Sequence, residues 1–452
     1  MILNKVLDAL DLHKTGFITG DEILPSRFAV TELAASSIGA VGCSVAHLLK
    51  SLNLVGELST CRVDRRLASL WFGQSIQPVN WEMPPLWDAI AGDYEASNGW
   101  IKLHTNLSHH RKAALSVLKC DADRGKVTHA IKSWDVNELE SQIVDAGGVA
   151  AAMRTRGQWA FHPQGRAVAS EPLICWSEPR ENLIRPWQPS NKRPLAGLRV
   201  LDLTRVLAGP VATRTLAGFG ASVLRIDPYG WDEANVVPDI TIGKRCAFLD
   251  LNDQSDRDKF VDLLEQAHVL VHGYRPEALD GLGFDRDTRM KIAPHVIEVS
   301  LNAYGQTGPW RNRRGFDSLV QMSSGIAAAG MEWANKNKPH PLPVQALDHA
   351  TGYLMAAAVV RALDSAVNGK GIADAHLSLA RTAKLLTEHE QIELGTLNME
   401  AKASDYSAEI EVTPWGDARR LKPPLLIEGT PLDWSRPAGE LGSSVAAFFV
   451  DN

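Results

Sequence analysis

The chain has 452 residues, of which 45% are hydrophobic, so it can bury a large core and is long enough for more than one domain. Its net charge of −6 gives no general reason to expect a nucleic-acid partner. Its five cysteines form no CxxC pair, and we find neither a signal-like core nor 18 unbroken apolar residues, so we expect a cytoplasmic protein without a membrane partner.

The first residues contain a stretch with the spacing of an EF-hand calcium loop. It runs from Asp11 to Glu22, with Gly16 at the sixth place of the loop. His13 and Thr15, however, stand where carboxylates or amides should coordinate, and no partner hand follows. We therefore favour an ordinary glycine-containing turn and expect no bound metal.

Residues 30–51 have helical spacing and resemble residues 344–365 without a gap. After a short gap, residues 63–67 resemble residues 373–377. Two alanine- and leucine-rich helices could look alike by chance, but the second block favours a partial duplication. On this alignment Ala34 stands opposite Asp348, so the first copy would lack that carboxylate. We interpret residues 1–75 as a helical, degenerate repeat whose apolar helix packs against the later one.

Residues 76–186 read as a small α/β domain. Asn98-Gly99 predicts a tight turn between two alternating strands, and helices are predicted at 108–119 and 135–146. Three histidines, at 104, 109 and 110, invite a metal-site interpretation. No cysteine or carboxylate accompanies them at ligand spacing, so we favour solvated histidines near a helix start.

A proline-rich linker, residues 178–193, leads into a large domain assigned to residues 187–400. Residues 194–226 read as strand, tight turn, helix and strand, which begins a parallel α/β sheet. Residues 346–363 predict a long apolar helix, and residues 401–452 are expected to pack back on the core. Five strands are predicted in this domain, at 199–203, 222–226, 245–251, 268–273 and 295–301.

A series of short motifs follows in order through the large domain, and the series is more specific than any one of them. The chain resembles the family III CoA-transferases (the CaiB/BaiF family), which include formyl-CoA transferase, carnitine CoA-transferase and α-methylacyl-CoA racemase. The motifs are Pro194-Leu-Ala-Gly-Leu-Arg-Val-Leu-Asp-Leu-Thr-Arg-Val-Leu-Ala-Gly-Pro210, Gly243-Lys-Arg245, Asp250-Leu251, Val271-His-Gly-Tyr-Arg-Pro276, Gly281-Leu-Gly-Phe284, Tyr304-Gly-Gln-Thr-Gly-Pro309, Gly315-Phe-Asp317 and Leu347-Asp348.

The resemblance implies an α/β fold with a Rossmann-like large domain, a small α/β domain and a possible homodimer. It also implies transfer of coenzyme A from an acyl-CoA to a carboxylic acid, with no permanently bound cofactor. Asp348 matches the aspartate that forms the covalent intermediate in that family. The anionic end of CoA needs cations and N–H donors. The expected CoA-binding residues are Thr204, Arg205, Leu207, Ala208, Lys244, Arg245, Gly273, Tyr274, Arg275 and Gly305.

This chain departs from the family pattern in three ways. The family runs from large to small domain and back, whereas here a fragment of large domain and the small domain come first. Phe316 replaces the histidine that the racemases use as a second base, and Leu207 stands where transferases commonly carry a glutamine. An acyl-CoA isomerase or racemase, and a degenerate CoA-binding subunit without turnover, therefore stay as alternatives to a transferase.

Overall fold

The computed structural model describes residues 1–391, 395 and 399–448, and its largest sheet has seven strands. Their order is β10-β9-β8-β11-β12-β13-β7, with β8, the first strand of the large domain, third in this order. This order is that of doubly wound nucleotide-binding folds, and it confirms the predicted α/β class. The parallel strands are β8 (Arg199–Leu203), β9 (Ser222–Asp227), β10 (Lys244–Phe248), β11 (Val269–His272), β12 (Ile297–Asn302) and β13 (Ala375–Ser378), and β7 (Cys175–Trp176) is antiparallel.

The strands are apolar because helices cover both faces of this sheet. Val200 and Val271 face one core, which contains α9 (Ala208–Gly218) and α16 (Ala346–Val367). Leu201 and Leu270 face the other core, which contains α11 (Gln254–Gln266). The shorter helices of this domain are α10 (Val237–Ile240), α12 (Pro276–Gly281), α13 (Arg286–Ile292), α14 (Asp317–Ser323) and α15 (Ile326–Trp333).

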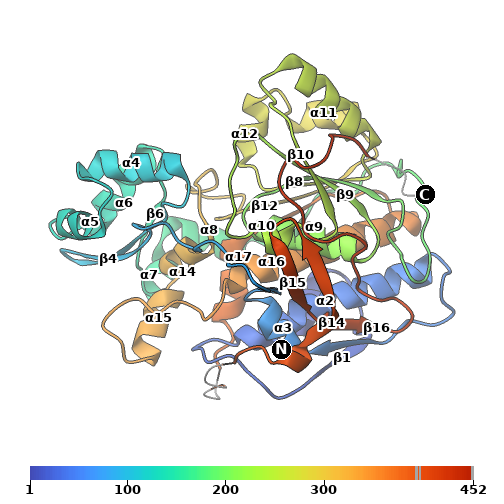
Figure 1. Ribbon diagram of the computed structural model, residues 1–452, viewed down its shortest axis with the longest axis horizontal. Coiled ribbons are helices and arrows are strands. Elements are labelled where there is room, and N and C mark those ends of the chain that lie inside the picture. The colour runs from blue at the N-terminus through green and yellow to red at the C-terminus, as the bar shows by residue number, and fades with distance from the viewer. Residues whose placement is uncertain (392–394, 396–398, 449–452) are drawn as a thin grey trace.

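Two long helices, α16 and α2 (Val30–Ser51), pack against each other through the middle of the molecule (Figure 1). This contact confirms the predicted pairing of the two apolar helices. Both are long and apolar enough to cross a membrane, but 89% of the most apolar window of each is buried inside the structure. Their apolar sequence is thus accounted for by packing inside the core.

A helix–strand–helix unit occurs twice. The first is α2, β2 (Cys61–Asp64) and α3 (Arg65–Trp71), and the second is α16, β13 and α17 (Leu379–Thr387). β2 lies between a parallel and an antiparallel neighbour, β1 (Gly16–Thr19) and β16 (Leu425–Ile427), just as β13 lies between β12 and β7. The two units therefore have the same order of elements, and the strand of each unit has one parallel and one antiparallel neighbour.

The structure corrects the alignment of these two units. The residues before the helices, Ala29 and Gln345, have nearly the same backbone angles, with φ −73° and ψ 63° against φ −75° and ψ 63°. Counting from these caps puts Glu32, not Ala34, opposite Asp348. The first unit therefore keeps a carboxylate at this place, which forms an ion pair with Arg65.

The small α/β unit lies at the left in Figure 1, beside the large sheet. Its strands are β4 (Gly92–Ala96), β5 (Gly99–Leu103) and β6 (Ala150–Ala152), in an antiparallel sheet. Ala96 pairs with Gly99, so the hairpin loop is Ser97-Asn98, one residue earlier than predicted. The helices are α4 (Ser108–Leu118), α5 (Arg124–Ile131), α6 (Val136–Asp145), α7 (Arg156–Phe161) and α8 (Pro163–Ser170), of which α4 and α6 were predicted.

Both ends of the chain return to the core. After α1 (Ile2–Ala9), the EF-hand-like stretch contains strand β1, and Asp11 pairs with Arg361 of α16. Near the other end, β14 (Tyr406–Thr413) and β15 (Gly416–Leu421) form a sheet with β3 (Ile76–Pro78). The C-terminal segment thus contacts elements from the start of the chain, and the domain boundaries at 75, 186 and 400 stay a prediction.

Candidate functional site

Asp348 is the third residue of α16, and a second carboxylate caps this helix from outside. Asp317, the first residue of α14, accepts the backbone N–H groups of Leu347 and Asp348 at 2.8 and 3.0 Å. These N–H groups lack partners within the helix, so Asp317 satisfies them. The Asp348 carboxylate accepts no hydrogen bond from any described residue, and 8% of the residue is exposed. It is therefore positioned by its backbone and left open for chemistry.

Both carboxyl groups bind a proton more tightly than an exposed aspartate does. Burial and the neighbouring Asp317 raise the pKa of Asp348 well above its usual value of 3.8. Burial also raises the pKa of Asp317, to about 6, although the N–H groups that it accepts oppose the shift. A buried carboxylate with few hydrogen bonds is a less solvated and more reactive nucleophile once ionised.

Two cavities meet at Asp348. The first, of about 280 Å³, lies between the small unit and the large domain; we call it the apolar cavity, lined by residues 84–88, 104, 106–107, 206–207, 232–236, 316–318, 345 and 348. The second, of about 360 Å³, is the arginine cavity, lined by residues 107, 109–110, 203–208, 231, 273–275, 278, 301–303, 313–316, 348 and 379. Val206, Leu207 and Phe316 line both, next to Asp348. A ligand with an anionic group at one end and an acyl group at the other could occupy both cavities, and the bond between its two parts would then lie next to the Asp348 carboxylate.

The arginine cavity holds four arginines, and two of them are already engaged. Arg205 donates to Tyr274 Oη at 2.7 Å and lies 3.5 Å from Asp227. Arg313 pairs with Glu140 at 2.9 Å. Arg275 and Arg314 form no ion pair with any described carboxylate, and burial together with Arg275 lowers the pKa of Arg314. Two cations that repel each other across a cavity favour an anionic ligand between them.

Most of the predicted site residues come together here. With Asp348, seven of the ten expected CoA-binding residues line the arginine cavity: Thr204, Arg205, Leu207, Ala208, Gly273, Tyr274 and Arg275. Arg245, in β10, and Gly305, packed against Glu171, are not part of its lining.

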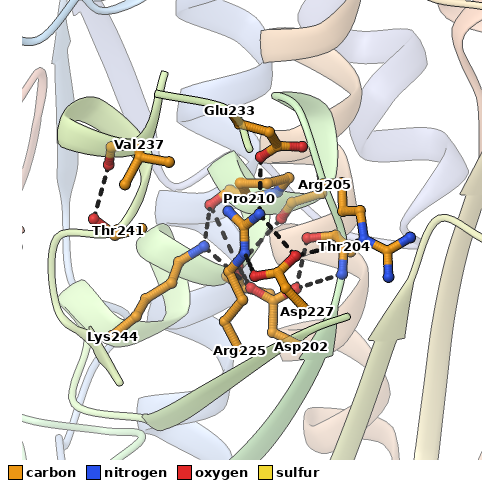
Figure 2. A network of polar contacts seen from close by, with 12 residues as sticks. Asp202, Thr204, Arg205, Pro210, Arg225, Asp227, Glu233, Val237, Thr241 and Lys244 are labelled. Atoms are coloured by element: carbon orange, nitrogen blue, oxygen red, sulfur yellow. Dashed lines mark hydrogen bonds and ion pairs between the residues drawn. The ribbon is translucent and has the colours of Figure 1, made fainter. Parts of the chain in front are cut away.

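Lys244 is also absent from the lining, and its predicted direct contact with CoA does not fit the structure. Figure 2 shows its amino group directed at Asp202 and at the carbonyl of Pro210, at 3.1 and 3.0 Å, and the side chain has no exposed surface. Asp202 also accepts the hydroxyls of Thr204 and Thr213. Lys244 therefore fixes the turn after β8 from behind.

The same network holds a strained residue of this turn. Val206 has φ 65°, which is unfavourable for a β-branched side chain. Its N–H donates to Glu233 at 2.7 Å, and Glu233 is held in turn by the buried Arg225, which also binds Asp227 (Figure 2). Strain that is held by surrounding contacts is typical of functional loops, and here it places Val206 and Leu207 at the junction of the cavities.

Several wall residues were not predicted as site residues. Asp317 could have been found from its Gly-Phe-Asp motif, whereas Arg313 and Arg314 stand in a loop with no pattern of their own. Two of the three histidines are buried rather than solvated, at 6% exposure for His104 and 2% for His110. His104 stacks on Phe316 with ring centroids 4.0 Å apart. Among the described residues, no cluster of three potential metal ligands occurs.

Comparison with known proteins agrees with this geometry. A sequence model of CoA-transferase family III matches residues 195–407. These residues, just under half of the chain, are thus similar to CoA-transferase family III. Similar proteins include an acyl-CoA transferase from Gibberella moniliformis, which is 26% identical over 359 residues, covering 73% of this chain and 63% of that protein.

The names of two further relatives state the carboxylic acids on which they act. The acetyl-CoA:oxalate CoA-transferase of Acetobacter aceti is 36% identical over 30% of this chain and 39% of its own length. Human succinyl-CoA:glutarate CoA-transferase is 31% identical over 40% of this chain and 44% of its own length. A crystal structure of Rv3272 from Mycobacterium tuberculosis aligns with a TM-score of 0.40 and 27% identity, covering 44% of this chain and 58% of that one. The chain thus spans less than two thirds of these relatives.

Proposed function

We propose that this protein is an acyl-CoA:carboxylate CoA-transferase that works through a covalent intermediate on Asp348. One observation carries the proposal: an unpartnered, buried carboxylate stands where an arginine-lined cavity meets an apolar one. Such a carboxylate can attack a thioester whose CoA lies on one side and whose acyl group lies on the other.

The reaction then runs in exchanges that balance without ATP. The Asp348 carboxylate attacks the thioester carbonyl, and the C–S bond breaks to give a mixed anhydride and CoA thiolate. The thiolate attacks the aspartyl carbonyl and releases the first acid, which leaves an aspartyl-CoA thioester. The second acid attacks this thioester to form a new anhydride and thiolate. Attack of the thiolate on the acyl carbonyl gives the new acyl-CoA and restores the carboxylate.

The chain's own residues prepare these steps. Asp317 holds the backbone of Leu347 and Asp348, which keeps the nucleophile at the junction. The N-terminus of α16 favours negative charge in its first turn. Burial disfavours the ionised form of Asp348. When the ionised carboxylate attacks the thioester, its negative charge passes to the leaving thiolate, so the reaction removes the buried charge from Asp348. Arg275 and Arg314 are proposed to bind CoA phosphates.

The nucleophile can be tested by trapping. Incubation with acyl-CoA and hydroxylamine should convert Asp348 to a hydroxamate, detectable by peptide mass spectrometry. Asp348→Ala should abolish CoA exchange, because Asp348 is the one carboxylate among the described residues that lines both cavities. Asp262→Ala, which removes an exposed carboxylate from α11, is the control and should leave exchange unchanged. Full exchange by Asp348→Ala would refute the mechanism.

The CoA position can be tested by binding. Arg275→Ala and Arg314→Ala should each weaken CoA binding, with a loss of about 1.5–3 kcal/mol for each charged hydrogen bond. Calorimetry with CoA, compared with dephospho-CoA, would show which arginine meets the 3′-phosphate. Arg257→Ala, on the far side of the sheet next to Phe284, is the matched control. Unchanged affinity in both cavity variants would place CoA elsewhere.

A further inference from the structure

The apolar cavity carries charge of one sign only. Its lining includes Asp88, Asp232, Glu233, Asp317 and Asp348, and no lysine or arginine is among the described residues that line it. The remaining walls are mostly apolar, with Pro84, Pro85, Leu86, Trp87, Leu107, Val206, Leu207, Val236 and Phe316. This charge pattern bears on which acyl groups can enter.

Three cations near the wall of this cavity form ion pairs with carboxylates of the protein. Arg111 pairs with Asp88 at 2.7 Å, and Lys102 pairs with Asp93 at 2.8 Å. Glu233 holds the buried Arg225. His104 is the one basic side chain in the described lining, and burial and the nearby Lys102 lower its pKa to about 4. It is therefore neutral at pH 7 and offers no positive charge.

One wall is formed by residues 84–88, here called the strap, which hydrogen bonds tie to both the small unit and the large domain. The carbonyl of Leu86 accepts Asn106 Nδ2 of the small unit at 2.9 Å and Asn235 Nδ2 of the large domain at 2.8 Å. Asp88 accepts the Thr105 hydroxyl at 2.8 Å. The side chains of Leu86 and Trp87 are 46% and 38% exposed, so the strap presents apolar surface along the entrance.

We infer that the acyl cavity selects a monocarboxylic acid with a short, uncharged, apolar chain and rejects dicarboxylic acids. This inference rests on the proposed function, because it places the acyl group of the thioester in the apolar cavity. A second carboxylate on the substrate would lose its hydration in a cavity whose described lining includes five acidic residues and no lysine or arginine, and a buried charge without a partner is strongly disfavoured. A hydrocarbon chain would gain by burial against Leu86, Leu207 and Phe316.

Two thioesters with four-carbon acyl groups separate these outcomes. Butyryl-CoA ends in a methyl group and succinyl-CoA in a carboxylate. Each is assayed by identity exchange with its own labelled acid, so the equilibrium constant is one and no unknown acceptor is needed. We expect kcat/KM for butyryl-CoA to exceed that for succinyl-CoA by at least about tenfold.

A charge added at the strap provides the matched test. Leu86→Arg places a cation at an exposed position of the cavity wall and should shift the preference toward succinyl-CoA by about tenfold or more. Leu86→Met, which keeps the volume without the charge, should keep the wild-type preference. A wild-type preference for succinyl-CoA would overturn the inference and leave the proposed transferase activity intact.

Binding keeps the inference testable without turnover. Asp348→Asn cannot form the anhydride, so calorimetry on this variant measures the affinity for both thioesters. Tighter binding of butyryl-CoA supports the inference even if no exchange occurs, which would refute only the transferase proposal. Equal or tighter binding of succinyl-CoA would overturn it.

Discussion

At the scale of single residues, Asp348 was predicted from the sequence as a site residue, whereas Asp317 was not. Asp348 was found because it precedes a long apolar helix in a series of ordered motifs. The role of Asp317 could not be found in this way, because the two residues are 31 positions apart and only the fold brings one to the helix start of the other. Lys244 shows the opposite case, since a lysine at a strand start looks the same in sequence whether it faces solvent or Asp202.

The coupled pair predicts how stability depends on pH. Both carboxyls have a pKa above 3.8 in the folded protein, so the folded state binds their protons more tightly than the unfolded state. Their contribution is most favourable below pH about 4 and is lost as pH rises through about 6 and beyond. Asp348→Asn removes one charge of the pair and should therefore stabilise the fold by about 1 kcal/mol or more at pH 7.

This gain should nearly vanish at pH 4, where the wild-type pair is protonated. Urea unfolding of both proteins between pH 4 and pH 8 would measure it, with the Asp262→Asn variant to account for a change in surface charge. A constant difference across this range would show that the pair does not titrate as the geometry indicates.

At the scale of elements, the predicted strands of the large domain are present within a few residues of their expected ends. These strands could be recognised in the sequence because both faces of the sheet are buried, so each strand is a nearly continuous run of apolar residues. Helix α5 and strands β14 and β15 were missed. Residues 408–412 of β14 alternate apolar and acidic side chains, as a half-buried strand would, but Ile410 and Val412 are exposed in the structure, and β14 pairs with β15 as an antiparallel ladder.

The contact between α16 and α9 depends on a residue without a side chain. A Cβ on Gly352 would lie 2.3 Å from the carbonyl oxygen of Ala208 and 2.8 Å from Val211. Gly352→Ala should therefore force the helices apart and cost about 1–3 kcal/mol of stability. Because Ala208 begins α9 directly after the strained turn, the change should also lower exchange activity.

Gly281→Ala provides the control for this substitution. Gly281 ends α12, and a Cβ there meets nothing within 4 Å, so its stability should stay within about 0.5 kcal/mol of wild type. Chemical denaturation and exchange rates of the two variants would be compared. Wild-type stability in Gly352→Ala would contradict the close approach of α16 and α9.

At the scale of the whole molecule, the helix–strand–helix unit of residues 30–71 repeats the order of elements of the unit that contains Asp348. The sequence found the repeat but placed its helices two residues out of register. The connection from α2 to β2 is longer than that from α16 to β13, and identities between alanine-rich helices do not fix a register. Backbone angles at the two caps decide it, and they place Glu32 opposite Asp348.

A buried cluster of charged residues around Asp239 joins segments that are far apart in the sequence. Its carboxylate accepts Arg214 of α9 at 2.9 Å and Arg420 of β15 at 3.2 Å, and it binds Ser75 just before β3. Although burial opposes ionisation, the two arginines lower the pKa of Asp239. Three segments far apart in the sequence therefore meet at one charge.

Asp239→Asn should destabilise the protein by about 3–5 kcal/mol, because it leaves the fully buried Arg214 without a counter-charge. If loss of that charge is the cause, adding Arg214→Leu should restore part of the stability, since the unpaired cation is then gone. Arg420 keeps its pair with Glu411 in both variants. Urea unfolding followed by tryptophan fluorescence would measure the three proteins, because Trp71 lies 4.9 Å beneath Arg214. Additive losses in the double variant would contradict this account and assign the cost to packing.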